Sequence, residues 1–518
     1  APDEADRMGI GGAIYFEPRT PKKSRAGAGA GLGSFGEGYG WLGGEVAHAG
    51  SGALVAFKSS TATNDYPYLD DNGTANTADD RTVNRQNADF TAREAWAVGR
   101  TALGDRGARV TTVFNAFDRE QGVSGIAAVP ALAARAETAR VLAGISAKVP
   151  CSSDPSCVLE FVTQGISARS SLRDPRRELG LLVTRLDSRG DRFGESARLT
   201  DAGTNWRALF GANFEAESLA LDGKSALRAE RRTGSARAAL GWSLGAGLSS
   251  DLLAVASCDQ TRGPNGSQAC ADLTPQGRIG ARYELGPVAL RGNVGRYQRV
   301  PTLGELYGIS PLVRGSAALV PERGSIFDLG ARSETRLGAV RAYADAGGFV
   351  REVSDLIAYR RSSLGAITPY NVGSARVLGA ELEAGAESLR HYRTSLSLTV
   401  LDPRDTTPNR ALQNDLVPYQ SRFVTSLFAE GFVDPHSRSV ELVSLDARYD
   451  YRASRFADPA GLIVLPATSE LDLGTSLILK RDITVRGAID DVFDAHHYDF
   501  IGYPVPGRSY HLSLEAWW

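Results

Sequence analysis

The sequence lacks the long apolar runs that form membrane-spanning helices, because no stretch of about 18 consecutive apolar residues occurs in it. This excludes a helical membrane protein but not a membrane β-barrel, whose strands carry only a weak alternating pattern. Charge of one sign is also missing, since 58 Lys and Arg stand against 60 Asp and Glu. The chain therefore offers no electrostatic basis for binding nucleic acid.

Cysteine is scarce, and the four cysteines form two close pairs, Cys151 with Cys157 and Cys258 with Cys270. Neither pair has the CxxC spacing or a nearby pair of histidines, so a zinc site is not expected. The spacing favours local disulfides in turns or loops, which form in an oxidising compartment. Catalytic motifs are absent as well: there is no nucleophile elbow, no HExxH and no carboxylate pair with an orienting partner. The sequence therefore does not predict an enzyme.

The last stretch of the chain, PGRSYHLSLEAWW, alternates between apolar and polar residues. Tyr510, Leu512, Leu514 and Trp518 fall on one face of the predicted strand, and the other face is mixed polar. An edge strand of a soluble sandwich would show the same period. An aromatic-ended strand with one apolar face is also what closes an outer-membrane barrel.

Segments of this kind recur throughout the chain and predict an all-β protein of about 22 antiparallel strands between residues 25 and 518. Clear examples lie at 392–401 and 467–480, and another strand is predicted at 179–187. The non-apolar face repeatedly carries Ser, Thr, Arg, Asp and Glu. A water-filled or plugged lumen tolerates such a face, whereas a soluble core of this size would not.

Connections between the predicted strands alternate between long and short. Long ones include 61–86, 298–325 and 493–507, and short ones include 286 and 481. Bacterial barrels have short periplasmic turns and long outer loops, with both termini inside. Closure of the sheet would also remove the edge strands of an open sheet. The sequence therefore predicts a closed barrel in an outer membrane.

Four motifs, in this order, resemble those of one family. They are GIGGAIYFEPRTP (Gly9 to Pro21), RYQRVPTLGELYG (Arg296 to Gly308), NVGSARVLGAELEAG (Asn371 to Gly385) and the segment from Ile489 to Trp518. The first resembles the end of the plug domain of TonB-dependent outer-membrane transporters. The others resemble their mid-barrel segment, their "N…GxE" strand and their C-terminal signature, although Asp490 and Asp491 stand where Asn is usual.

The resemblance implies a transporter in the outer membrane of a Gram-negative bacterium. It implies uptake of a scarce nutrient too large for porins, such as a ferric siderophore or cobalamin. It also implies energy from an inner-membrane TonB–ExbB–ExbD complex and contact with outer-membrane lipid. Tyr510, Leu512, Leu514 and Trp518 would then form the signal read by the barrel-assembly machinery.

The sequence departs from the family at its start. Family members carry a plug of well over a hundred residues, whereas residues 1–24 have room only for the end of one, ahead of a barrel at 25–518. Three explanations are open: a separate plug polypeptide, a plug that was removed, or a plugless passive pore or structural barrel scaffold for partner proteins. The retained plug-end strand favours the first two, because a strand without a sheet leaves backbone groups unpaired.

Two outer connections carry candidate substrate-binding residues. Tyr66 and Tyr68 lie in the first long connection, and His496, His497 and Tyr498 lie in the last one. Adjacent histidines in extended chain point apart, so we do not expect one metal site to use both.

The first long connection also carries an acidic cluster around a glycine. Its members, all with side-chain oxygen atoms, are Asp70, Asp71, Asn72, Asp79 and Asp80. Oxygen ligands of this kind can hold Ca²⁺, but the spacing is not that of an EF-hand. A solvated acidic loop is the favoured interpretation, and no resident cofactor is predicted.

Overall fold

The computed structural model describes the chain from residue 18 to its end, with several internal gaps. The described ranges are 18–70, 77–104, 107–151, 156–180, 183–223, 226–264, 266–268, 274–309, 313–361, 366–388, 391–408, 416–480 and 482–518. The plug-like motif that starts at Gly9 therefore lies mostly outside the described residues.

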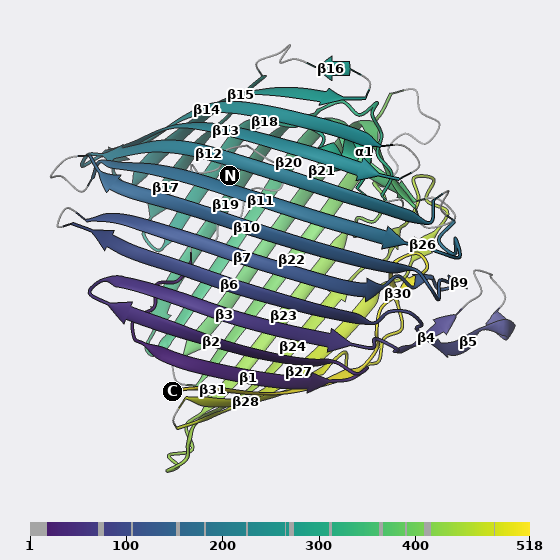
Figure 1. Ribbon diagram of the computed structural model, residues 1–518. Coiled ribbons are helices and arrows are strands. Elements are labelled where there is room, and N and C mark those ends of the chain that lie inside the picture. The colour runs from purple at the N-terminus through teal and green to yellow at the C-terminus, as the bar shows by residue number, and fades with distance from the viewer. Residues whose placement is uncertain are drawn as a thin grey trace.

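A closed antiparallel barrel accounts for nearly all of the described chain (Figure 1). The sheet has 23 strands; 22 of them close the barrel, and β16 (Gly266–Gln268) pairs only with β15 (Leu248–Gly263). The barrel strands are β1 (Arg25–Gly33), β2 (Gly38–His48), β3 (Ser51–Ala62), β6 (Phe90–Leu103), β7 (Ala108–Gly122), β10 (Arg135–Pro150), β11 (Val158–Arg173), β12 (Arg185–Ala202), β13 (Trp206–Asp222), β14 (Leu227–Gly245), β15 (Leu248–Gly263), β17 (Thr274–Leu285), β18 (Val288–Arg299), β19 (Glu322–Leu337), β20 (Val340–Arg361), β21 (Ile367–Ser388), β22 (Tyr392–Asp405), β23 (Phe423–Val433), β24 (Val440–Arg452), β27 (Thr468–Leu479), β28 (Ile483–Asp490) and β31 (Ser509–Trp517). The predicted fold class is confirmed.

Several short elements lie in the connections at one end of the barrel. They are β4 (Pro67–Asp70), β5 (Arg81–Asn84), β8 (Gly125–Ile126), β9 (Val129–Pro130), β16 (Gly266–Gln268), β25 (Arg455–Phe456), β26 (Val464–Leu465), β29 (Tyr498–Phe500), β30 (Tyr503–Pro504), the 3-10 helix η1 (Thr77–Asp79) and the helix α1 (Leu303–Tyr307). Within the described ranges, no helix has the length and apolar character needed to cross a membrane.

The barrel closes where its first and last strands meet. β1 pairs with β31 from Gly27 opposite Trp517 to Gly33 opposite His511. The inward face of β1 carries only glycine over this length, and Trp41 and Trp517 lie across it with ring centroids 5.3 Å apart. A side chain on Gly27 or Gly29 would collide with these indoles. Glycine at these positions therefore allows Trp41 and Trp517 to pack across β1.

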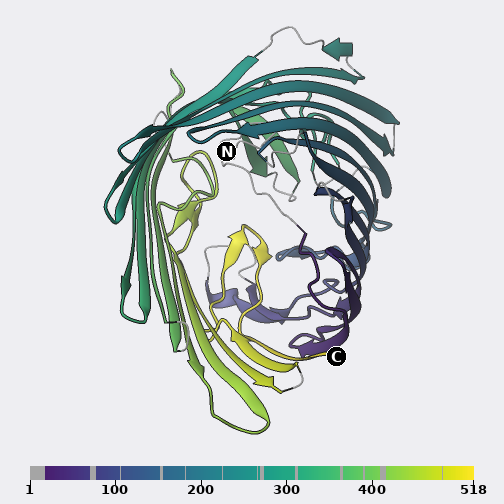
Figure 2. The ribbon, with the colours of Figure 1, turned by 90° about the vertical axis from the view of Figure 1, so that its left-hand side faces the viewer.

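The two ends of the barrel differ as predicted. Tight turns such as 286–287 and 338–339 join strands at one end, where Gly286 and Gly338 take φ of 59° and 65°. Long connections lie at the other end, and Figure 2, seen from the turn end, shows β4–β5 and β29–β30 within the outline of the ring. Short turns are periplasmic in bacterial barrels, so the long connections face outward from the cell.

The outward face of the barrel is apolar between two polar ends. Leu32, Phe210 and Leu445 are 72%, 52% and 65% exposed, which places them toward lipid. Exposed aromatic residues near the turn end form an interfacial ring, as barrels in membranes show. Its members are Trp206, Tyr283, Tyr392 and Trp518. Tyr510, Leu512 and Leu514 are also exposed on this face, so the predicted alternation of the last strand is confirmed.

One predicted strand was wrong. The apolar segment that suggested a strand at 179–187 belongs mostly to a connection, and β12 runs from Arg185 to Ala202 instead. Leu179 is buried in a cluster with Leu172 of β11 rather than in the sheet. β12 itself is rich in charge, and its charges are neutralised locally, as when Arg185 and Arg189 pair with Asp187 and Asp191. The part of β12 from Arg185 to Asp191 therefore gives no apolar alternation for sequence reasoning to find.

Candidate functional site

The inner wall of the barrel is lined with paired charges. Glu160 of β11 lies between Lys148 and Arg198 at 3.4 and 3.2 Å, and Arg278 meets Asp251 at 2.6 Å. Each partner comes from a neighbouring strand, so the sheet register sets the pairs. A polar, charge-balanced wall suits a hydrated or plugged lumen.

The segment before β1 lies against this wall. The carboxylate of Glu45, which is almost fully buried, accepts hydrogen bonds from the guanidinium groups of both Arg19 and Arg25. A side chain on Gly52 would contact Pro21, so β3 meets the same segment. The chain therefore enters the barrel wall from the inside, near the turn end.

The predicted tyrosines of the first and last outer connections lie together. The Tyr66 hydroxyl donates to the Pro504 carbonyl at 2.7 Å, and the Tyr498 hydroxyl donates to the Leu69 carbonyl at 2.7 Å. The two connections are neighbours because β1 and β31 close the barrel. Burial raises the pKa of the Tyr66 phenol, so it remains a hydrogen-bond donor at neutral pH.

Tyr68 is the most buried of these tyrosines, with 4% of its surface exposed. Its hydroxyl donates to the carbonyl of Ala127 at 3.3 Å, and the Ala127 amide donates to Gly502 at 2.7 Å. Three outer connections, before β6, before β10 and before β31, are thereby joined in one layer. Tyr68 holds this layer together from within.

His496 and His497 contact different groups. His497 is buried, and its Nε2 lies 3.1 Å from the Glu470 carboxylate of β27. His496 is exposed, and its Nδ1 contacts the Asp494 carbonyl at 2.9 Å. The adjacent imidazoles therefore do not share a site, and only His496 is accessible to a ligand from outside.

Only part of the acidic cluster lies within the described residues. Asp70 ends β4, and Asp79 and Asp80 lie at and just after η1, whereas Asp71 and Asn72 fall outside the described residues. Among the described residues, no group of three or more His, Cys, Asp or Glu is placed to hold a metal ion. The calcium site stays a prediction.

The connection between β18 and β19 contains a polar network whose role the sequence reasoning missed. The buried Glu305 carboxylate accepts hydrogen bonds from Tyr359 at 2.6 Å, the Thr302 amide at 2.7 Å and Arg299 at 3.1 Å. Burial opposes ionisation of Glu305, but these donors outweigh it and hold the pKa of that carboxyl below its usual range. The signal was present in the sequence, since Thr302 and Glu305 form a capping box at the start of α1.

α1 folds back onto the inner wall and leaves a recess at the outer mouth. Leu303 packs with Leu219, Leu221 and Ala229 of β13 and β14. A cavity of about 390 Å³ lies between α1 and the wall. Its lining includes Ile166, Arg192, Glu217, Gly304, Ile309 and Tyr359. This volume is in the range of small-molecule sites and combines apolar and charged groups.

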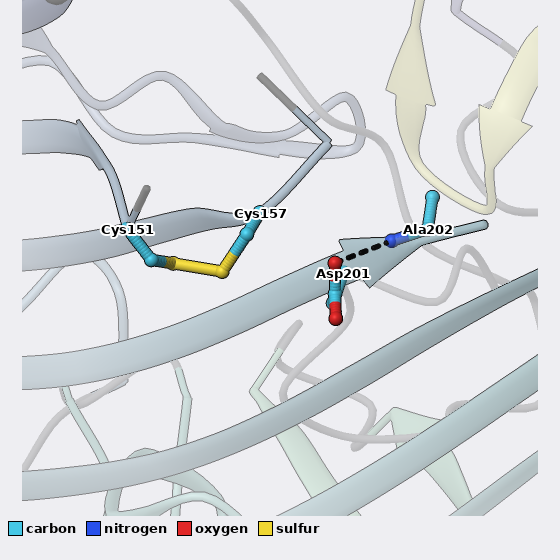
Figure 3. The surroundings of a disulfide bond; sticks show 4 residues. All are labelled: Cys151, Cys157, Asp201 and Ala202. Carbon is cyan, nitrogen blue, oxygen red and sulfur yellow. Dashed lines mark hydrogen bonds between the residues drawn. A yellow bond between two sulfur atoms is a disulfide. The ribbon is translucent and has the colours of Figure 1, made fainter. Parts of the chain in front are cut away.

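A disulfide closes the turn between β10 and β11. Figure 3 shows Cys151 bonded to Cys157, beside the end of β12 at Asp201 and Ala202. Cys258 is also disulfide-bonded, and Cys270, its predicted partner, lies outside the described residues. The first predicted pair is therefore confirmed, and it lies at the turn end rather than among the outer connections.

Comparison with known proteins agrees with this geometry. A family model described as "TonB dependent receptor-like, beta-barrel" matches residues 24–492. The copper transporter OprC has a similar structure (TM-score 0.76, 16% identity), with 97% of this chain and 82% of that chain covered. The ferric yersiniabactin uptake receptor FyuA from Yersinia pestis is similar over 97% and 81% of the two chains (TM-score 0.75, 15% identity).

The FrpB iron transporter from Neisseria meningitidis gives a TM-score of 0.75 at 12% identity, over 96% of this chain and 82% of that chain. At such identities the likeness concerns the fold. The family match spans most of the barrel, and such barrels are outer-membrane proteins of Gram-negative bacteria. This chain belongs to the TonB-dependent receptor family, a family of outer-membrane transporters and receptors.

Proposed function

We propose that this chain forms the barrel of an uptake transporter for a chelated metal or a similar scarce nutrient, such as a ferric siderophore or cobalamin. The proposal rests on the arrangement of side chains at the outer mouth of the barrel. There, Tyr66 and Tyr498 tie the first and last connections together. The recess under α1 lies at the same end of a charge-lined lumen.

We choose the proposed substrate contacts by their access to the outside of the barrel. His496 is the accessible imidazole of the last connection, and Tyr66 and Tyr498 border the same layer. Tyr68 and His497 are buried, so they are proposed to support the outer connections rather than to contact the substrate. Similar structures that transport copper, ferric yersiniabactin and iron favour a metal chelate as the cargo.

A plug is proposed to occupy the lumen, with residues 1–24 as its end and the barrel at 25–518. Support comes from Arg19 and Pro21, which lie against Glu45 and Gly52 on the inner wall. The body of the plug would lie outside these 518 residues, in the same polypeptide or in a second one. The TonB complex would act on that plug, and the barrel-assembly machinery would insert the barrel.

An uptake assay with and without TonB tests the proposed transport function. A strain lacking this protein should lose uptake of a subset of radiolabelled ferric siderophores or cobalamin, and the protein expressed in trans should restore it. Restoration should fail when TonB is deleted. Uptake that persists without TonB would contradict an energised transporter.

The presence of a plug can be tested on the complex after gentle extraction from its native membrane. Denaturing gel electrophoresis with intact mass should reveal plug-sized sequence, either as a stoichiometric second chain or as added mass on this one. The native complex should also show little conductance in planar bilayers. A large, constantly open conductance would contradict the proposal and support a passive pore.

A further inference from the structure

A polar groove lies on the outward face of β18 to β21, strands that run side by side in Figure 1. Its volume is about 470 Å³. Its lining includes Arg296, Arg323, Ser325, Glu352, Ser354 and Arg376. We call it the outer arginine groove.

The sheet register places the groove at one level of the barrel. Arg296 is opposite Ser325, Ser325 is opposite Glu352, and Glu352 is opposite Arg376. Because side chains opposite one another share a face of the sheet, this row forms a continuous polar band across four strands. Arg323 and Ser354, opposite each other, form the next row toward the outer end.

The row immediately on the membrane side is apolar. It runs through Val294, Phe327, Val350 and Leu378, which are successive register partners. Phe327 is 49% exposed, and Val294 and Leu378 are also exposed, so this row faces lipid. The outer arginine groove therefore lies at the boundary of the apolar band, on the side of the long connections. This is the level of the outer-leaflet headgroups.

The charges of the groove are not balanced within the protein. Among the described residues, Arg296, Arg323, Arg376 and Glu352 form no ion pair, so the groove carries three cations and one anion. Some exposed arginines elsewhere on the outward face do have acidic partners. Arg185 of β12, for example, lies 2.7 Å from Asp187.

We propose that the outer arginine groove binds the phosphorylated sugar headgroup of an outer-leaflet glycolipid. Arginine guanidinium groups match phosphate geometry, and basic pockets at a membrane surface bind anionic headgroups. The Ser325 and Ser354 hydroxyls suit sugar hydroxyl groups, whereas the Glu352 carboxylate opposes the negative charge of the phosphate groups. Acyl chains would then cover Val294 and Phe327 directly below.

Native mass spectrometry of the barrel in detergent tests the proposal, with diphosphorylated lipid A as the probe. The wild type should retain this lipid, and it should bind the dephosphorylated form at least several-fold more weakly. The double variant Arg296→Gln/Arg376→Gln should bind lipid A roughly tenfold more weakly, because each cation near an anionic headgroup contributes. Glu352→Gln should bind lipid A more tightly.

The double variant Arg185→Gln/Arg189→Gln is the matched control, since it removes two exposed arginines that already have acidic partners. It should bind lipid A like the wild type. Equal binding by the Arg296→Gln/Arg376→Gln variant, or no preference for the phosphorylated lipid, would overturn the proposal. Displacement of lipid A by millimolar inorganic phosphate would assign the groove to a soluble anion instead. These readouts do not depend on transport, so they stand apart from the uptake test.

Discussion

The Tyr498 hydroxyl donates a hydrogen bond of 2.7 Å to the Leu69 carbonyl, joining the two ends of the chain across 429 positions of sequence. Such a tie is available only because the barrel closes through β1 and β31. It fixes the first outer connection relative to the last, and both carry candidate substrate contacts.

Replacing Tyr498 by Phe should loosen this tie without changing the barrel. A net hydrogen bond contributes roughly 0.5–1.5 kcal/mol, so amide exchange at 66–70 should rise about two- to tenfold. Hydrogen–deuterium exchange with mass spectrometry measures this change. Tyr283→Phe is the control, since Tyr283 is exposed on the lipid face. Unchanged exchange in the Tyr498→Phe variant would show that the hydrogen bond does not hold the connection.

The Glu305 network should give α1 a pH-dependent stability. A carboxyl whose pKa is lowered on folding stabilises the fold above its ordinary value near 4.5, and the contribution is lost as the pH falls through the lowered pKa. Protection factors of residues 303–308 should therefore fall between pH 6 and pH 3. Glu305→Gln should lower protection at pH 7 by roughly 1–3 kcal/mol and remove most of the pH dependence. A variant that keeps the wild-type pH profile would contradict this assignment.

Much of the fold could be predicted from the sequence because a barrel repeats one simple pattern. The alternation at 392–401 and at the C-terminus persists in β22 and β31, since lipid on one side and a polar lumen on the other impose it. β12 could not be found this way. Its outward charges near the outer end lie beyond the lipid and pair with each other, so no apolar face marks that end of the strand.

The candidate site was predictable only in part. The tyrosines of the first and last connections could be named from their position, but the contact of Tyr498 with Leu69 depends on barrel closure. The network around Glu305 joins Arg299 to Tyr359, which lies on a strand far along the chain. Long-range contacts of this kind have no local sequence signal beyond the capping box at Thr302.

The disulfide between Cys151 and Cys157 should act locally. Because it closes a short loop, with a sequence separation of 6, its entropic contribution is about 2 kcal/mol. The double variant Cys151→Ser/Cys157→Ser should therefore increase exchange in the turn between β10 and β11 and leave the amount of assembled barrel unchanged. Loss of assembled barrel in semi-native gels would instead give the disulfide a role in folding.

Removing Trp518 should impair assembly more than its contacts alone suggest. Its backbone exchanges two hydrogen bonds of 2.9 Å with Ala26, at the turn end of the seam that closes the barrel. The side chain is 71% exposed at the lipid interface, where the assembly machinery would meet it. We expect deletion of Trp518 to lower the folded protein in outer-membrane fractions several-fold, as measured by immunoblot of heat-modifiable bands. Trp206→Ala removes another exposed interfacial indole away from the seam and should have little effect. Normal levels after the deletion would show that the seam closes without this residue.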